Sequence, residues 1–211
     1  FLSANMPVLI KSHGQILQLT QEQLGPNQPR QLIAELLTPV QLEELDETGE
    51  LNVGIPLEGV GTFRLSAFKQ RGTIAAVFRC MPTDIPALDT LHLPEALANL
   101  AMARRGLVLM VGATGTGKST TLAAMLQHRN RHMAGHILTI EDPIEFLFPN
   151  LKSVVNQREV GRDVQSLQIG LKNAMRQAPD CIFIGEIRDR ETMSAALSYA
   201  LSGHLVLSTM H

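Results

Sequence analysis

The chain has 211 residues, enough for one large domain or two small ones, and its 45% apolar content is ordinary for a globular protein with a buried core. A formal net charge of −2 gives it no general electrostatic attraction to nucleic acid or anionic lipid. The sequence contains no apolar run near the roughly 20 residues that cross a bilayer and no signal peptide, so we expect a cytosolic protein without membrane insertion.

The two cysteines, Cys80 and Cys181, lie far apart and in apolar stretches. We therefore expect two buried, reduced thiols and no metal site built from them. The chain begins at Phe1 inside an apolar segment and ends at His211 directly after an apolar run, so we expect a fragment of a longer protein.

Residues 1–82 predict a small α+β domain. Two short strands around Ser12, His13 and Gly14 predict a hairpin, and two helices follow, the second between Pro39 and Gly49. Segments rich in β-branched and aromatic residues then predict three strands at residues 51–55, 59–68 and 73–78. Residues 83–94, which are flanked and interrupted by prolines, predict a linker.

Residues 95–211 alternate between apolar strand patterns and helical patterns after a first helix at 95–104. Such alternation is typical of an α/β fold with a mainly parallel sheet covered by helices. The expected strands are residues 107–111, 137–140, 182–184 and 205–207, and the expected helices are residues 118–131, 167–177 and 192–201.

A glycine-rich segment between the strand at 107–111 and the next helix matches the spacing Gly-x₄-Gly-Lys-[Ser/Thr]. Glycines let backbone N–H groups converge on phosphates, and the helix that follows directs its positive end at the same anion. Lys118 is expected to reach the β and γ phosphates, and the Ser119 hydroxyl to ligate Mg²⁺. The expected nucleotide-binding residues are Gly112, Ala113, Thr114, Gly115, Thr116, Gly117, Lys118, Ser119 and Thr120.

Acidic residues follow two of the predicted strands. Glu141, Asp142 and Glu145 come after residues 137–140, and Glu186 ends the apolar segment from Cys181, where Gly185 replaces the usual first acid of a Walker B strand. Ligands of open α/β sheets bind at the edge formed by the carboxyl ends of the strands, where a carboxylate can activate water or hold Mg²⁺. The alternative is a solvated acidic turn and a charge at a strand end.

Two histidines, His204 and His211, bracket the last predicted strand. Because they lie at opposite ends of one strand, both cannot reach one phosphate. We expect one at the γ-phosphate edge of the sheet and the other at a subunit or domain contact.

Several long motifs occur in a fixed order: GATGTGKST, GHILTIEDPIEF, VNQREVGRD, LKNAMRQAPD, IGEIRDRETM and GHLVLSTMH, after FRLSAFKQRGTIAAVFR in the first domain. Together they resemble the PilT/PilU family of type IV pilus retraction ATPases, within the hexameric secretion ATPases of the GspE/PulE type. The motifs leave the choice between a PilT-like and a PilU-like paralogue open.

The resemblance implies a PAS-like domain at residues 1–82 and a truncated RecA-like ATPase core at 95–211, with ATP and Mg²⁺ as cofactors. It places Glu141, Asp142 and Glu145 in an acidic box, with Glu145 polarising the attacking water. Glu186 would act as the Walker B acid near Mg²⁺. The other expected metal-binding residues are Ser119, Glu141 and Asp142. The remaining catalytic residues that it implies are Lys118, the arginines Arg64 and Arg79 (Arg71 less directly), and the histidines His204 and His211.

The resemblance also implies a function: an ATP-hydrolysing motor subunit of a homo-hexamer that drives pilus retraction and twitching motility. Its partners would be an inner-membrane platform protein and a PilT-like paralogue. It would be located in the cytoplasm, associated with the inner membrane through the pilus machinery. Alternatives are a nucleotide-gated accessory subunit acting through a PilT-like partner, a type II secretion or pilus extension ATPase, and a nucleic-acid translocase. The extension branch commonly carries a four-cysteine zinc insertion, whereas this chain has two cysteines, which argues against that branch. A chain with one tyrosine and no tryptophan offers little for base stacking, which argues against a nucleic-acid translocase.

Overall fold

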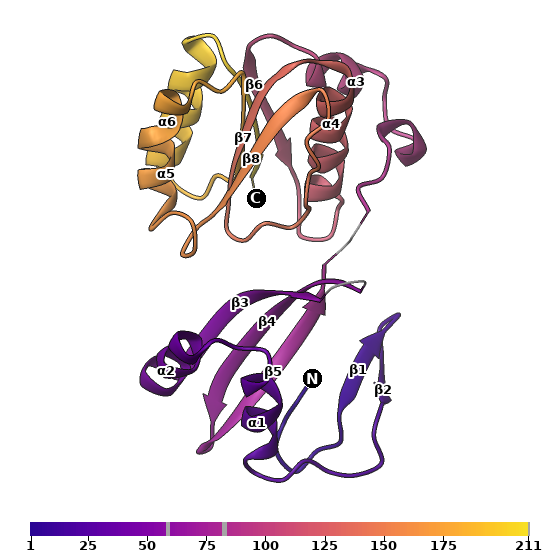
Figure 1. Ribbon diagram of the computed structural model, residues 1–211. Coiled ribbons are helices and arrows are strands. Elements are labelled where there is room, and N and C mark those ends of the chain that lie inside the picture. Colours follow the sequence, from indigo (N-terminus) through magenta and orange to yellow (C-terminus); the bar gives the residue numbers. More distant parts are fainter. Residues whose placement is uncertain (58–59, 82–83, 211) are drawn as a thin grey trace. The chain divides into compact units, whose positions relative to one another are not determined.

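The computed structural model describes residues 1–57, 60–81 and 84–210, so predictions about residues 58, 59, 82, 83 and 211 lie outside it. The chain divides into two compact units, Phe1–Pro82 and Thr83–His211 (Figure 1). None of the helices in the described part of the chain is long and apolar enough to cross a membrane.

The first unit combines two small antiparallel sheets with two helices. A hairpin of two strands stands apart from a three-stranded sheet in the order β3-β4-β5, and the helices precede that sheet in the chain (Figure 1). The elements are β1 (Leu9–Ser12), β2 (Gln15–Gln18), α1 (Gln28–Ala34), α2 (Pro39–Thr48), β3 (Glu50–Leu57), β4 (Gly61–Gln70) and β5 (Thr73–Cys80).

The local sequence explains where α2 begins and what it covers. Thr38 Oγ1 accepts a hydrogen bond from the N–H of Gln41, and Gln41 Oε1 accepts one from the N–H of Thr38, which forms a capping box ahead of Pro39. Leu45 of this helix and Ile33 of α1 pack onto the sheet, so burial of apolar area fixes both helices.

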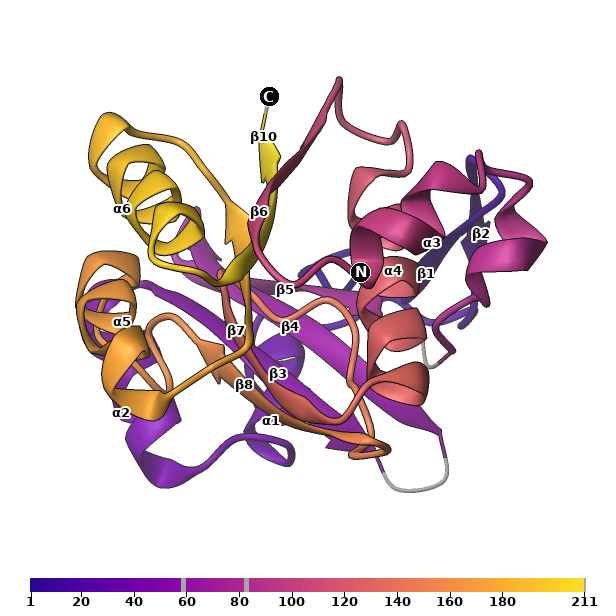
Figure 2. The same ribbon diagram turned by 90° about the horizontal axis from the view of Figure 1, so that it is seen from above.

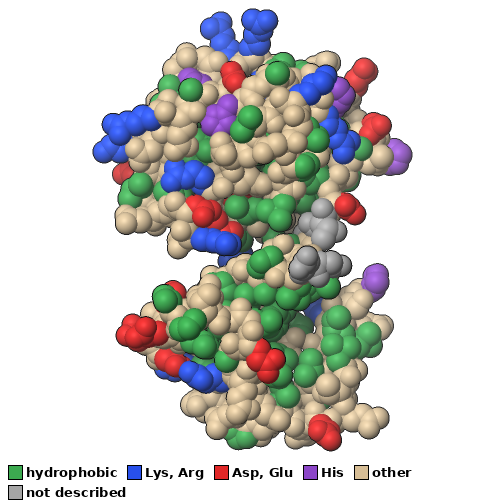
Figure 3. Space-filling view, viewed as in Figure 1, with side chains coloured by type: hydrophobic (Ala, Val, Ile, Leu, Met, Phe, Trp, Pro, Cys, Tyr) green, Lys and Arg blue, Asp and Glu red, His purple; other side chains and the backbone are tan. Residues whose placement is uncertain are grey.

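The hairpin of the first unit keeps much of its apolar surface in contact with solvent. Ile10, Ile16, Leu17 and Leu19 are all exposed. Hydrophobic side chains gather on this side of the first unit in the space-filling view (Figure 3). A two-stranded ribbon has no second layer against which to bury them.

The second unit has a five-stranded parallel sheet in the order β6-β10-β9-β7-β8. Figures 1 and 2 show α3 and α4 on one face of this sheet and α5 and α6 on the other. The elements are α3 (Ala96–Ala101), β6 (Gly106–Val111), α4 (Lys118–His132), β7 (Gly135–Glu141), β8 (Ser153–Glu159), α5 (Leu167–Ala174), β9 (Cys181–Glu186), α6 (Arg190–Leu201) and β10 (Leu205–Met210).

Alternation along the strands divides the core of this unit between the two faces. Leu138, Ile140 and Val206 pack with α5 and α6, whereas Ile137 and Leu207 pack with Leu122 and other residues of α4. Strands covered on both faces read as continuous apolar runs, which is why they could be predicted. The predicted α/β fold class, with a mainly parallel sheet, is confirmed.

Two expectations were incomplete or wrong. Strand β8 was not predicted, because only two valines of Ser153–Glu159 are apolar and its remaining residues are polar. Cys80 is exposed at the end of β5 instead of buried. Cys181 is fully buried as expected, and burial raises the pKa of its thiol to about 12.

Candidate functional site

The phosphate loop connects β6 to α4 across residues 112–117. Gly115 and Gly117 have φ angles of 82° and 89°, in the left-handed region that favours glycine, and the Thr116 hydroxyl donates to the carbonyl oxygen of Ala113 at 2.8 Å. Because Gly117 has no side chain, it cannot cap α4. The first N–H groups of that helix therefore remain available to an anion.

Lys118 is the first residue of α4 and turns back over the loop that precedes it. Its Nζ donates to the carbonyl oxygens of Gly112 at 2.6 Å and of Ala113 at 3.0 Å. A phosphate is a stronger acceptor than these neutral carbonyls, since charge-assisted hydrogen bonds are about twice as strong as neutral ones. The lysine is therefore held at the loop in a position from which it can bind phosphate.

The predicted acids lie at the same edge of the sheet as the phosphate loop. All strands of this sheet run parallel, so the ends of β6, β7 and β9 meet at one edge. Glu141 is the last residue of β7 and Glu186 the last of β9. Asp142 and Glu145 follow β7, and both are exposed. The structure thus brings the four acids and the loop to one edge.

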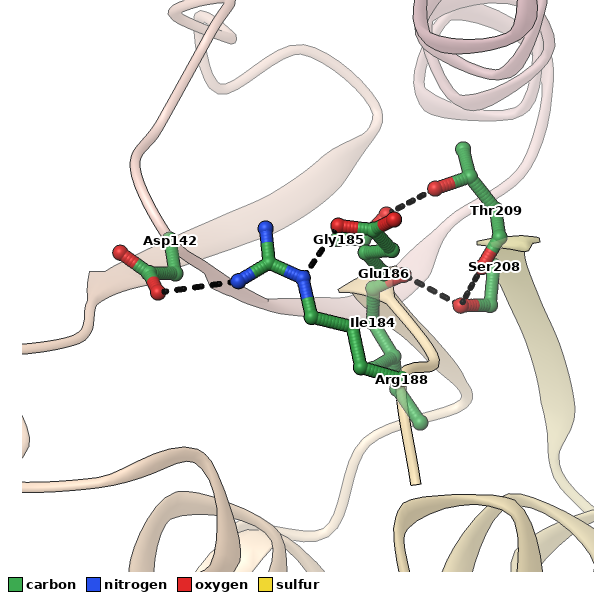
Figure 4. A network of polar contacts seen from close by, with 7 residues as sticks. All are labelled: Asp142, Ile184, Gly185, Glu186, Arg188, Ser208 and Thr209. Carbon is green, nitrogen blue, oxygen red and sulfur yellow. Dashed lines mark hydrogen bonds and ion pairs between the residues drawn. The ribbon is translucent and has the colours of Figure 1, made fainter. Parts of the chain in front are cut away.

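Gly185 creates a local irregularity at the end of β9. The register with β10 pairs Ser208 with Ile184 and Thr209 with Glu186, so Gly185 is the extra residue of a bulge. Thr209 Oγ1 donates to the Gly185 carbonyl oxygen at 2.6 Å, as Figure 4 shows. Bulges re-aim neighbouring side chains, and this one sets the direction of Glu186.

The missing side chain of Gly185 allows β7 to approach closely. A Cβ at Gly185 would lie 3.3 Å from the Cα of Glu141 and 3.6 Å from its Cβ. The position where a Walker B strand usually carries its first acid is therefore packed against the carboxylate residue of the adjacent strand.

Arg188 bridges two of the predicted metal-binding carboxylates (Figure 4). Its Nε lies 2.5 Å from Oε2 of Glu186, and its Nη1 lies 3.9 Å from Oδ2 of Asp142. A guanidinium here neutralises part of the negative charge that Mg²⁺ would otherwise balance. Its place in the IGEIRDRETM motif did not predict this role.

Glu141 is the most buried acid of the site. Only 4% of the surface of Glu141 is exposed to solvent. Burial raises the pKa of its carboxyl group to about 7, a hydrogen bond from Gln157 opposes that rise, and the negative charge of Glu145 adds to it. The Gln157 Nε2 lies 3.3 Å from Oε1 of Glu141. Burial therefore favours the protonated form of this carboxyl group more than solvent would.

His204 does not join this cluster within the second unit. It precedes β10, at the opposite edge of the sheet from the phosphate loop, and its carbonyl oxygen accepts from the N–H of Gly106. The six residues of β10 separate the two edges by about 20 Å. The Nδ1 of His204 lies 3.2 Å from the carbonyl oxygen of Tyr199. His211 lies outside the described residues.

Arg64 and Arg79 belong to the first unit, where they are direct partners across β4 and β5. Arg64 is half-buried and Arg79 exposed. Like charges opposite each other on a sheet repel, and an anion between them would relieve that repulsion. Arg71 lies in the turn between the two strands, with a φ of 47°.

The residues at this edge are oxygen ligands, and within the described part of the chain no three acidic, histidine or cysteine side chains lie close enough together to hold a metal ion. Ser119 supplies a hydroxyl in the first turn of α4, and Glu186, Asp142 and Glu141 supply carboxylates at the same edge. Mg²⁺ prefers such hard oxygen ligands and usually takes only one or two carboxylates besides substrate phosphates and water.

Residues 43–211 match the family model described as type II/IV secretion system protein. The chain is 47% identical over its full length to "Type IV pilus ATPase PilU" of Pseudomonas aeruginosa, covering 55% of that protein. It is 41% identical to "Type IV pilus retractation ATPase PilT" of the same organism, covering 61% of it. A crystal structure of the pilus retraction motor PilT with bound ADP matches the whole chain with a TM-score of 0.96 and 42% identity, and the chain covers 62% of it.

The chain therefore spans between about half and two thirds of the length of these relatives. The predicted relationship to PilT and PilU is confirmed, and the fold likeness to PilT agrees with an N-terminal domain followed by a RecA-like domain. This chain belongs to the family of type II/IV secretion system proteins.

Proposed function

We propose that the protein to which this chain belongs is an ATP-hydrolysing motor subunit that powers the retraction of type IV pili. The single observation that carries the proposal is the meeting of the phosphate loop with Glu141, Glu145 and Glu186 at one sheet edge. The identity of 47% to a type IV pilus ATPase over the whole chain supports it.

The positions of the residues support the following roles. Lys118 and the first N–H groups of α4 bind the β and γ phosphates of the nucleotide. Ser119 and Glu186 would hold Mg²⁺, with Asp142 and Glu141 at the same sheet edge, and the ion would supply positive charge to the phosphate oxygens. Glu145 orients and polarises the attacking water. The preference for ATP rests on the relatives alone.

The first unit contributes positive charge from Arg64 and Arg79. We propose that these arginines reach the nucleotide in the assembled ring and neutralise charge that develops on the γ-phosphoryl oxygens. Hydrolysis then depends on the movement of that unit, which couples chemistry to force. His211, which follows β10 in the chain, is assigned to the γ-phosphate edge, and His204 to a subunit or domain contact.

The assembly we propose is a homo-hexamer on the cytoplasmic side of the inner membrane, docked on a pilus platform protein and able to bind a PilT-like paralogue. A second candidate is a nucleotide-gated accessory subunit that acts through such a paralogue. The observation that favours it is the higher identity to PilU, 47% against 41% to PilT.

The test is the hydrolysis of ATP and of GTP by the full-length protein with and without Mg²⁺, together with its mass in solution with and without nucleotide. We expect ATP-selective turnover in a particle of six chains. Lys118→Ala is expected to abolish both turnover and phosphate binding. Absence of Mg²⁺-dependent turnover would overturn the motor assignment, and turnover that arises only on mixing with a PilT-like protein would establish the accessory role.

A further inference from the structure

The segment after β7 carries two acids of the proposed site on a stretch without regular structure. Residues 142–150 contain no helix or strand, and Asp142 and Glu145 are exposed. Hydrolysis needs its acids in fixed positions, because even a displacement of about 1 Å can cost roughly 100-fold in rate. Something outside the segment must therefore hold it.

The side chain of Gln157, on the edge strand β8, contacts this segment through both ends of its amide. Its Oε1 accepts from the N–H of Phe148 at 2.8 Å. Its Nε2 donates to the carbonyl oxygen of Phe146 at 2.8 Å and to Oε1 of Glu141 at 3.3 Å. One side chain thus ties together the segment and the buried acid at the end of β7.

Glu159 extends this contact along the same strand. Its Oε2 accepts from the N–H of Ile144 at 3.0 Å, and its own N–H donates to Oδ2 of Asp163 at 2.9 Å. Side chains two residues apart on a strand point to the same face, so Gln157 and Glu159 act together. Between them they hold the backbone on both sides of Glu145.

We propose that Gln157, supported by Glu159, is a positioning residue that aligns Glu141 and the acidic segment 142–148 for hydrolysis. This inference rests on the proposed ATPase function. An amide suits the place because it both donates and accepts. A leucine would make none of these hydrogen bonds, and a glutamate would lose both donors and set a second negative charge beside Glu141.

Asn156 provides a matched control on the same strand. It points to the opposite face, where its Oδ1 lies 2.9 Å from Nε2 of His136. Gln157→Glu and Asn156→Asp make the same chemical change, from amide to carboxylate, at adjacent residues with the same change in net charge. A difference between the two variants therefore reports the location of the group.

The experiment measures kcat and KM for ATP in the full-length protein and both variants. We expect Gln157→Glu to lower kcat by about tenfold or more while KM for ATP changes by less than about threefold, because the phosphate loop is untouched. Asn156→Asp is expected to keep kcat within about twofold of the unaltered protein. Equal effects of the two variants, or a change confined to KM, would overturn the assignment.

A second measurement does not depend on a folded variant. In the unaltered protein, amide hydrogen exchange should be slow at Ile144 and Phe148, whose N–H groups donate to β8, and faster at the exposed Leu147 between them. Uniformly fast exchange would show that the contact does not hold in solution and would overturn the inference. A total lack of ATP turnover by the unaltered protein would instead count against the proposed function, with the exchange pattern still deciding the contact.

Discussion

The Nε of Arg188 lies 2.5 Å from Oε2 of Glu186, which places a guanidinium on the carboxylate assigned to Mg²⁺. The arginine side chain is 66% exposed and that of the glutamate 21% exposed. Solvent screens such a pair, so its contribution is about 1 kcal/mol or less. A metal ion that binds this carboxylate would therefore need little free energy to displace the guanidinium.

Replacing Arg188 by glutamine should lower the Mg²⁺ concentration that gives half-maximal ATP turnover, by at most roughly fivefold, because the cation would no longer compete for Glu186. Titration of Mg²⁺ at fixed ATP measures this change. Arg190→Gln, two residues along and also exposed, is the control and should leave the titration unchanged. An increased Mg²⁺ requirement in Arg188→Gln would contradict the competition.

Adding a methyl group at Gly185 should destabilise the second unit. The new Cβ would lie 3.3 Å from the Cα of Glu141, which is tighter than most such contacts, so β7 and β9 must separate by a few tenths of an ångström. We expect Gly185→Ala to lower the free energy of unfolding by about 1–3 kcal/mol and to reduce turnover through the displaced Glu141. Urea denaturation checks the first effect. Gly25→Ala, whose Cβ would meet only a side chain at 3.6 Å, should change stability little.

The buried carboxyl group of Glu141 should make stability depend on pH. Its pKa rises from 4.5 to about 7 in the folded chain, so the folded state retains a proton that the unfolded state loses. The free energy of unfolding should thus fall as pH increases through this window, by roughly 3 kcal/mol from this group. Urea denaturation of the nucleotide-free protein at pH 5 and pH 8 measures it. Glu141→Gln should remove that part of the difference, and an unchanged difference would refute the assignment.

The two cysteines should differ sharply in reactivity. Cys80 is exposed, whereas Cys181 is fully buried and its pKa is raised to about 12. Since the thiolate is the reactive form, a thiol reagent should modify one group of this chain in the native state and both in urea. Cys80→Ser should abolish the native reaction. Rapid labelling that persists in that variant would show that the core around β9 opens.

The sequence predicted the phosphate loop well because its chemistry depends on local spacing. The loop lies between β6 and α4, and that helix begins at Lys118, where the motif required it. Apolar strands covered on both faces were equally visible. Strand β8 could not be predicted, because an edge strand needs fewer apolar residues. Polar residues such as Gln157 and Glu159 are typical of loops as well as of edge strands.

Contacts between distant segments could not be read from the chain. The contact of Gly185 with Glu141 depends on β7 and β9 being neighbours, although β8 comes between them in the sequence. The alternation of strands and helices predicts parallel strands, but it does not predict their order in the sheet, which is set by packing of the whole unit.

Helix α4 contacts the chain directly after the acidic segment, through a residue near the end of the helix that is remote from the phosphate loop. Asn130, which is fully buried, donates from Nδ2 to the carbonyl oxygen of Pro149 at 2.7 Å and accepts at Oδ1 from the N–H of Leu151 at 3.3 Å. The 15 residues of α4 form a rod about 22 Å long. Asn130 therefore ties the chain that follows Glu145 to the helix whose first residue is Lys118, so the phosphate-binding helix and this part of the chain are joined by direct hydrogen bonds.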